Sequence, residues 1–178
     1  MKLLMIINSL DVGGAETSLE SLCIALKDSI DIEIITLSGN GDIAQRLQDK
    51  NLTVHQLGFN KSFLPFNECI KLYKLISSIN PEVVHTWMYH SNLLGGIISK
   101  LLGIKKIIWS VHAFNIKPGM LKLSTRFLIR FLAYFSYIIP HHIICCSKES
   151  LKVHEKIFYC KKKMVFIPNG VNTNIFKY

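Results

Sequence analysis

A pair of glycines stands between an apolar run and a helical pattern near the start of the chain. The run KLLMII occupies residues 2–7, and Gly13 and Gly14 precede a helical pattern at residues 15–28. Glycines at such a place let backbone N–H groups approach a phosphate, and the following helix directs its positive end toward it. The pair therefore indicates a phosphate-binding loop. A tight turn without a ligand explains the same residues equally well.

Acidic and hydroxyl side chains stand at two predicted helix starts. Glu16 lies in the first turn of the helix at residues 15–28, and Ser147 precedes the helix predicted at residues 148–160. An acid near a helix N-terminus stabilises the helix, and a serine just before the first turn commonly caps it. Each side chain could instead contact a ligand, and both interpretations stay open.

Polar and aromatic residues gather after two apolar runs in the middle of the chain. His112 follows the run at residues 105–111, while His85 and Trp87 close the run that begins at residue 82. Three more such residues, Tyr89, His90 and Asn92, come just beyond Trp87. A cluster of this kind suits stacking on a sugar and recognition of its hydroxyls, but it equally suits the capped start of a helix. For His112 the alternative is a buried structural histidine.

Short β-branched runs alternate with helical patterns along the chain. Strands are predicted at residues 2–7, 31–37, 52–57, 82–86, 105–111, 141–146 and 163–167. Helices are predicted at residues 15–28, 41–50, 66–79, 88–102, 119–138 and 148–160. This alternation is typical of an α/β domain with a doubly wound, Rossmann-like parallel sheet. We expect one domain over residues 1–168 and the start of a linker at 169–178. The first strand should lie near the centre, with the glycine pair on the same sheet edge as His112.

Composition narrows the functional classes. The chain of 178 residues is 49% hydrophobic and 19% charged, which indicates a globular protein. Its five cysteines form no CxxC pair, which favours a reducing, cytoplasmic compartment and argues against a zinc site. The sequence lacks GxxxxGK[ST] and GxGxxG, so a P-loop NTPase and a dehydrogenase are disfavoured. It also lacks the motifs of nucleic-acid-binding modules, so no nucleic-acid partner is expected.

The net charge of +9 implies an anionic partner. Within residues 119–138, Lys122, Arg126 and Arg130 recur every four residues among apolar and aromatic side chains. Such a helix can lie at an anionic membrane surface, with its basic residues near the phospholipid headgroups. A core helix with a solvated basic face fits the same pattern.

Four segments of the sequence, taken together on this β–α pattern, carry a resemblance to a known family. They are GGAE after the first run, EVVHTWMYHSNLLGGIISKLLGIKKIIWSVHAFN in the middle, IICCSKES later and VFIPNGVNTNIF at the end. Their order and spacing resemble the amino-terminal domain of a GT-B fold glycosyltransferase of family 4. The resemblance implies that the backbone of Gly13 and Gly14 lies near the diphosphate of a nucleotide-sugar. It also implies that His112 reaches the transferred sugar or its phosphate, because an imidazole can donate a hydrogen bond there without a permanent charge.

The resemblance further implies an activity. A family 4 transferase moves a sugar, with retention of configuration, from a nucleotide-sugar to a saccharide or lipid-linked acceptor, and we expect no metal or other cofactor. The acceptor-binding candidates are then Glu16, His85, Trp87, Tyr89, His90, Asn92 and Ser147.

In the family, a second domain binds most of the nucleotide-sugar and follows a segment similar to IPNGV, usually with aspartate where this chain has Asn172. We therefore expect these residues to be the acceptor-side half of the enzyme, inactive alone. Its partner would be a donor-binding domain, in the same chain or as a separate one. The setting would be the cytoplasmic membrane face, in cell-surface polysaccharide or lipopolysaccharide synthesis. The alternative is a non-catalytic, lipid-binding interaction module.

Overall fold

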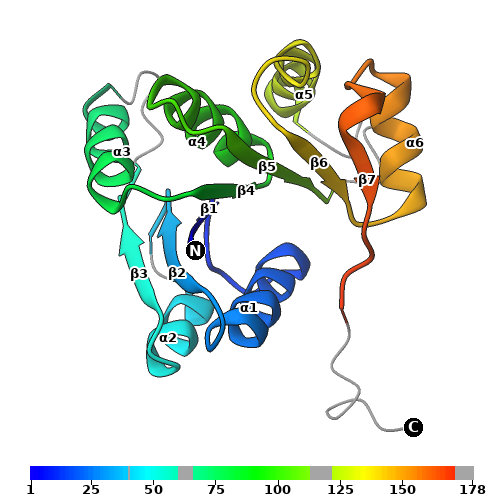
Figure 1. The fold of residues 1–178 in the computed structure, drawn as a ribbon. Coiled ribbons are helices and arrows are strands. Elements are labelled where there is room, and N and C mark those ends of the chain that lie inside the picture. Colours follow the sequence, from blue (N-terminus) through cyan, green and yellow to red (C-terminus); the bar gives the residue numbers. More distant parts are fainter. Residues whose placement is uncertain (40, 60–65, 113–121, 171–178) are drawn as a thin grey trace, which may run out of the picture.

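A seven-stranded parallel sheet organises the protein. The computed structural model describes residues 1–39, 41–59, 66–112 and 122–170. Within them the strand order is β3-β2-β1-β4-β5-β6-β7, and every neighbouring pair is parallel (Figure 1). The strands are β1 (Lys2–Ile7), β2 (Asp31–Thr36), β3 (Thr53–Gln56), β4 (Val83–Trp87), β5 (Lys106–Val111), β6 (His142–Cys145) and β7 (Met164–Phe166). The predicted Rossmann-like sheet, with its first strand near the centre, is confirmed.

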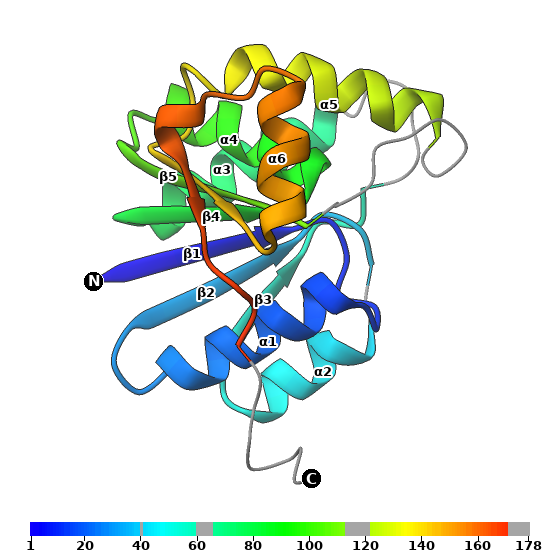
Figure 2. The same cartoon turned by 90° about the vertical axis from the view of Figure 1, so that its right-hand side faces the viewer.

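Helices cover both faces of the sheet in the described residues. They are α1 (Gly14–Leu26), α2 (Asp42–Asp49), α3 (Phe66–Ile79), α4 (Tyr89–Leu101), α5 (Leu123–Phe135), α6 (Lys148–Lys156) and the short 3-10 helix η1 (Lys161–Lys163). Helices α1 and α2 lie on one face, and α3 to α6 lie on the other (Figure 2). Because all strands are parallel, their carboxyl ends lie along a single edge of the sheet, here called the carboxyl edge.

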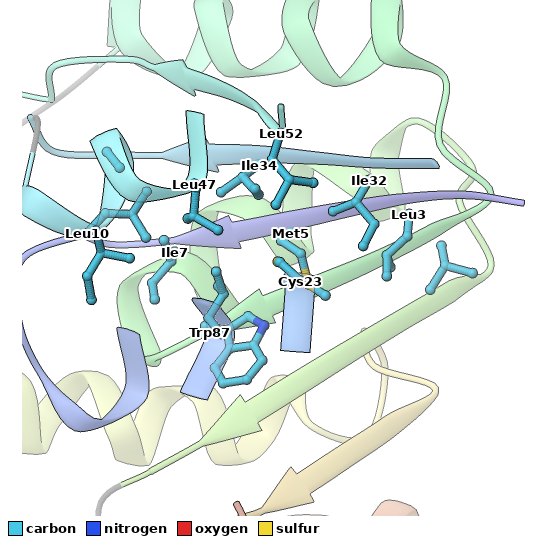
Figure 3. Packing of buried hydrophobic residues seen from close by; sticks show 14 residues of the cluster. Leu3, Met5, Ile7, Leu10, Cys23, Ile32, Ile34, Leu47, Leu52 and Trp87 are labelled. Carbon is cyan, nitrogen blue, oxygen red and sulfur yellow. The ribbon is translucent and has the colours of Figure 1, made fainter. Parts of the chain in front are cut away.

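The first strand shows why the sheet needs both layers. Leu3, Met5 and Ile7 pack toward α1 and α2, whereas Leu4 and Ile6 pack toward α3 and α4. A strand buried on both faces has no polar side to present, which explains the unbroken apolar run KLLMII. Figure 3 shows the core between the sheet and α1–α2, which reaches from the start of β1 to the end of β4.

Two predicted helices are shorter in the structure. The helix expected at residues 119–138 is α5, which ends at Phe135 and begins after Lys122, its N-cap residue. The helix expected at residues 148–160 ends at Lys156. The chain turns there because Phe158 adopts a left-handed φ of 69°, and the Tyr159 N–H returns to the carbonyl of His154 at 3.1 Å. Residues 119–121 and Asn172 lie outside the described residues.

Candidate functional site

The loop between β1 and α1 carries the glycine pair at the carboxyl edge, as predicted. Gly13 is the N-cap residue of α1, and Gly14 is its first helical residue. A Cβ on Gly13 would collide with Oε2 of Glu16, whereas a Cβ on Gly14 would meet nothing within 4 Å. The Glu16 carboxylate therefore folds back over Gly13, at the position of a capping-box acid. The Glu16 carboxylate therefore covers the start of α1 at Gly13, whereas the space beside Gly14 is free.

The segment between β2 and the start of α2 packs against the glycine loop and holds it in place. The Ser38 hydroxyl donates to the carbonyl of Asn8 at 2.7 Å, and the Ile43 N–H donates to the carbonyl of Leu10 at 3.1 Å. A Cβ on Gly41 would collide with the backbone of Leu10. Gly41 thus permits a close approach that holds the glycine loop in place. The only signal for this role in the sequence is weak, a glycine at the start of a predicted helix.

Three aromatic rings form a stack at the carboxyl edge, here called the ring stack. The centroids of His85 and Trp87 are 4.8 Å apart, and those of Trp87 and His112 are 5.1 Å apart with an interplanar angle of 20°. Nε2 of His85 hydrogen-bonds to the hydroxyl of Ser110 at 2.8 Å. The structure brings together three predicted site residues and adds Ser110, which the sequence analysis did not single out. The strand register explains the addition, because it sets Trp87 beside Ser110.

Burial keeps both imidazoles of the ring stack neutral near pH 7. Burial lowers the pKa of His85 from 6.5 to about 3, with a smaller contribution from the neighbouring His112. Burial likewise lowers the pKa of His112 to about 4. A neutral imidazole offers one N–H donor and one nitrogen acceptor. His112 can therefore donate a hydrogen bond to an anionic oxygen without carrying a charge itself.

Backbone strain is concentrated at Met88, between the ring stack and α4. Its φ of 72° and ψ of 162° fall in a region that is almost confined to glycine. Two hydrogen bonds hold this conformation: Met88 N–H donates to the carbonyl of Ser110 at 3.1 Å, and Asn92 N–H donates to the carbonyl of Met88 at 2.9 Å. Such strain persists where the surrounding structure enforces it, commonly at ligand sites. It sets the point at which α4 leaves the edge.

Two of the predicted acceptor contacts face the interior of the domain. Tyr89 is buried, and its hydroxyl hydrogen-bonds to Nε2 of His154 at 2.9 Å. Asn92 is fully buried, and its amide hydrogen-bonds to the hydroxyl of Thr86 at 2.7 Å. These contacts attach the start of α4 to the sheet and to α6. A role in acceptor binding stays a prediction for both.

The remaining predicted residues are more accessible. His90, in the first turn of α4, is exposed. Ser147 is half-buried, and its hydroxyl accepts from the N–H of Ser150 at 2.9 Å, so its interpretation as an N-cap is confirmed. Arg126 and Arg130 lie on α5, apart from the ring stack.

One buried donor at the carboxyl edge lacks a partner in the described part of the chain. The indole N–H of Trp87 is buried and has no hydrogen-bond partner among the described residues. In these same ranges, no three His, Cys, Asp or Glu side chains gather closely enough to hold a metal ion. None of the helices that the structure describes combines the length and hydropathy of a membrane span.

Comparison with known proteins assigns the chain to a family. The model of Glycosyltransferase Family 4 matches residues 12–175, which include the glycine pair, the ring stack and α5. The chain belongs to glycosyltransferase family 4. The resemblance predicted from the sequence is thereby confirmed.

Two relatives indicate how much of a family 4 protein this chain represents. It is 27% identical over 168 residues to the UDP-Gal:alpha-D-GlcNAc-diphosphoundecaprenol alpha-1,3-galactosyltransferase of Escherichia coli, covering 92% of this chain and 43% of that protein. HepE of Anabaena, in complex with UDP-glucose, superposes with a TM-score of 0.80 at 16% identity, over 100% of this chain and 46% of HepE. The chain therefore spans about half the length of these relatives.

The fold alone does not identify a transferase. The UDP-N-acetylglucosamine 2-epimerase of Rickettsia bellii superposes with a TM-score of 0.65 at 10% identity, over 95% of this chain and 45% of that one. Family 4 membership consequently rests on the sequence match, and the structural likeness shows the shared fold.

Proposed function

We propose that residues 1–178 form the acceptor-side half of a transferase that moves a sugar from a UDP-sugar to a saccharide or lipid-linked acceptor. Family membership supports a transferase, and the names of the Escherichia coli and Anabaena relatives support UDP-linked donors and, for the former, a diphosphoundecaprenol-linked acceptor. In the reaction, a bond from the anomeric carbon to an acceptor oxygen replaces the bond to the diphosphate. UDP leaves with the bonding electrons, and the proton of the acceptor hydroxyl passes to the departing phosphate oxygen.

The observation that carries this proposal is the ring stack on the same edge as the glycine loop. Trp87 is stacked against His112, and His85 is anchored to Ser110, so the His112 imidazole has a fixed plane. Negative charge develops on the departing phosphate as the bond breaks. A fixed neutral donor stabilises that charge more than it stabilises the ground state. We assign this role to His112.

The glycine loop supplies a second set of donors. The open N-terminus of α1 at Gly14 directs backbone N–H groups and the positive end of the helix toward the carboxyl edge. Glu16 lies over Gly13, where its carboxylate would repel a phosphate placed directly above it. We therefore propose that the diphosphate approaches from the Gly14 side. We also propose that the sugar keeps its configuration, and only family membership supports this.

The acceptor would meet the accessible residues of this edge. His90 is exposed in the first turn of α4, and Ser147 is half-buried at the start of α6, whereas Trp87 is buried in the ring stack. Tyr89 and Asn92 would contribute indirectly, because their buried hydrogen bonds hold the start of α4 in place. No metal enters this scheme.

Binding of the nucleotide-sugar donor would need a second protein surface opposite the carboxyl edge. One sheet edge offers a few neutral donors and little surface to bury a nucleotide, so we expect weak donor binding and no turnover by residues 1–178 alone. A donor-binding domain, joined to this chain or supplied separately, would complete the site. The acceptor and the net charge of +9 support a position at an anionic, cytoplasmic membrane face.

Ligand titrations of the 178-residue chain, followed by amide NMR, test this division. A soluble GlcNAc-diphospholipid analogue should shift amides at residues 85–92 and 112, whereas UDP-galactose should produce at most weak shifts near Gly14. The non-catalytic alternative predicts no saccharide-dependent shifts at the carboxyl edge. Tight binding of UDP-galactose, or sugar transfer by this chain alone, would contradict the half-enzyme proposal.

A further inference from the structure

Helix α5 is apolar on the face that it turns to solvent. Leu123, Phe127, Phe131 and Tyr134 recur every three or four residues, and their exposed fractions are 78%, 73%, 46% and 69%. We call these four residues the apolar stripe. Positions three or four apart share one face of a helix, so they form a continuous band about 20 Å long.

The opposite face of the same helix is already used by the core. Ile129, Leu132 and Ala133 are buried against the sheet. A helix of a soluble domain ordinarily turns polar residues to solvent, so an exposed apolar stripe opposite the core indicates a surface that a partner covers. The sequence analysis placed a stripe of cations on this helix and left open whether it faces a membrane or only solvent. The structure adds large apolar side chains on the exposed face beside those cations.

Cations lie along the flank of the apolar stripe that adjoins α6. Arg130 of α5 and Lys156 of α6 line a hollow of about 600 Å³, together with Tyr134, Tyr137 and Phe158. Figure 1 shows the two helices as neighbours on the same side of the sheet. Helix α5 contains no acidic residue, and of the two glutamates on α6, Glu155 pairs with Lys161 at 3.2 Å.

The combination of an apolar band with cations beside it determines which partner fits. A second copy of the chain would bring cations against cations, with a net charge of +9 on each molecule. An anionic bilayer satisfies both parts, because apolar side chains enter the boundary of the acyl chains while Arg and Lys contact lipid phosphates. Aromatic rings are also well suited to the interface between headgroups and acyl chains.

We propose that α5 is an interfacial anchor that inserts the apolar stripe into an anionic phospholipid bilayer, with lipid phosphates bound at the hollow between Arg130 and Lys156. The inference deepens the proposed membrane setting of the transferase and rests on it for its biological purpose. Because α5 runs antiparallel to the strands, Leu123 lies at the end nearest to the carboxyl edge (Figure 2). The anchor would hold the acceptor side of the site close to the membrane surface.

Vesicle flotation of the 178-residue chain tests the apolar stripe. Vesicles of phosphatidylcholine mixed with phosphatidylglycerol should bind the protein, and Phe127→Ser with Phe131→Ser should weaken binding on the order of tenfold. Phe66→Ser with Tyr73→Ser on α3 is a matched control, since those side chains are 74% and 45% exposed. The control should bind like the parent. Equal loss in both pairs would overturn the proposal.

The hollow is tested by a charge-matched comparison. Arg130→Gln with Lys156→Gln should weaken binding to the anionic vesicles on the order of tenfold or more, since each cation near such a surface contributes substantially. Lys71→Gln with Lys74→Gln removes the same charge from α3 and should have a small effect. If both pairs weaken binding equally, diffuse net charge is responsible and the headgroup site is wrong.

A reporter at the apolar stripe measures insertion directly. Phe127→Trp should show a blue-shifted emission with anionic vesicles and quenching by brominated acyl chains, whereas Tyr73→Trp on α3 should show neither. Absence of quenching at residue 127 would overturn insertion. Sedimentation velocity without lipid should show a monomer, and a dimer dissolved by the Phe127→Ser, Phe131→Ser pair would assign the stripe to a second copy. Vesicle binding and amide shifts at the carboxyl edge are separate measurements, so either proposal can fail alone.

Discussion

The carboxyl edge and the outer face of α5 depart from ordinary packing in opposite directions. At the edge, polar groups are buried: His85, Ser110 and Asn92 are all nearly inaccessible to solvent. On α5, large apolar side chains such as Phe127 and Tyr134 are exposed. Buried polar groups and exposed apolar bands are the two informative exceptions to the usual distribution of residues.

The two regions differ in what their unusual side chains contact. Buried polar groups at the edge hydrogen-bond within the chain, as His85 does to Ser110, so this part of the edge can be rigid before a ligand arrives. On α5, the rings of Phe131 and Tyr134 contact Phe135 of the same helix, yet the side chains of the apolar stripe stay largely exposed to solvent. The first region is therefore ordered in advance, as its proposed role in catalysis requires, and the second suits the proposed contact with a membrane. Substitutions should affect stability in one region and association in the other.

The largest expected effect separates the two regions by stability. Trp87 is 4% exposed, so Trp87→Ala should lower the free energy of unfolding by roughly 3–5 kcal/mol through the lost packing and the cavity left behind. Phe127→Ala, at an exposed site, should change it by less than about 0.5 kcal/mol. Urea unfolding followed by circular dichroism measures both. Similar losses in the two variants would remove the proposed distinction.

Substitutions at Gly41 and at its neighbour Gly39 test whether the carboxyl edge is rigid. Gly41→Ala would force a Cβ into the backbone of Leu10, which cannot move without displacing the glycine loop, so we expect a loss of about 1–3 kcal/mol. Gly39→Ala has open space around its Cβ and should be close to neutral. Thermal unfolding of both variants measures the difference. A stable Gly41→Ala protein would mean that the loop adapts and is not preorganised.

Acid should weaken the edge more than the surface of α5. The folded-state pKa values of His85 and His112, about 3 and 4, lie below the ordinary value of 6.5, so the unfolded chain binds more protons as the pH falls. The stabilisation is complete above pH 6.5 and decreases below it. For His85 alone the loss at pH 5 is about 2 kcal/mol.

Urea unfolding at the two pH values checks this expectation. His85→Leu should reduce the pH dependence by about that amount. A parent protein whose stability is constant down to pH 5 would show that the imidazoles are not held neutral by burial.

The sequence predicted the sheet well because its signals are local and repeated. The run KLLMII and the β–α alternation predicted β1 and the parallel sheet, and Gly13 was correctly expected at the carboxyl edge. The cluster of His85, Trp87 and His112 was foreseeable because residues that follow parallel strands meet at one edge.

Other parts of the site depend on contacts between distant residues, which carry no local signal. Ser110 is a small polar residue in a strand pattern, and only the register sets it beside Trp87. Gly41 matters because it packs on the backbone at Leu10, and Met88 because hydrogen bonds enforce a conformation that its residue type disfavours. For α5 the sequence analysis identified the cations but not the exposed apolar stripe, because which apolar side chains of a helix face solvent depends on how the helix packs against the sheet.

Turnover by the complete enzyme is the most direct test of the role assigned to this edge. The measurement uses residues 1–178 together with a donor-binding domain, a UDP-sugar and a lipid-linked acceptor, and it compares His112→Ala with His141→Ala as a control at the opposite edge. We predict that His112→Ala lowers kcat on the order of 100-fold with a much smaller change in acceptor KM, because its hydrogen bond forms mainly in the transition state. Full turnover by the His112→Ala enzyme would contradict the account.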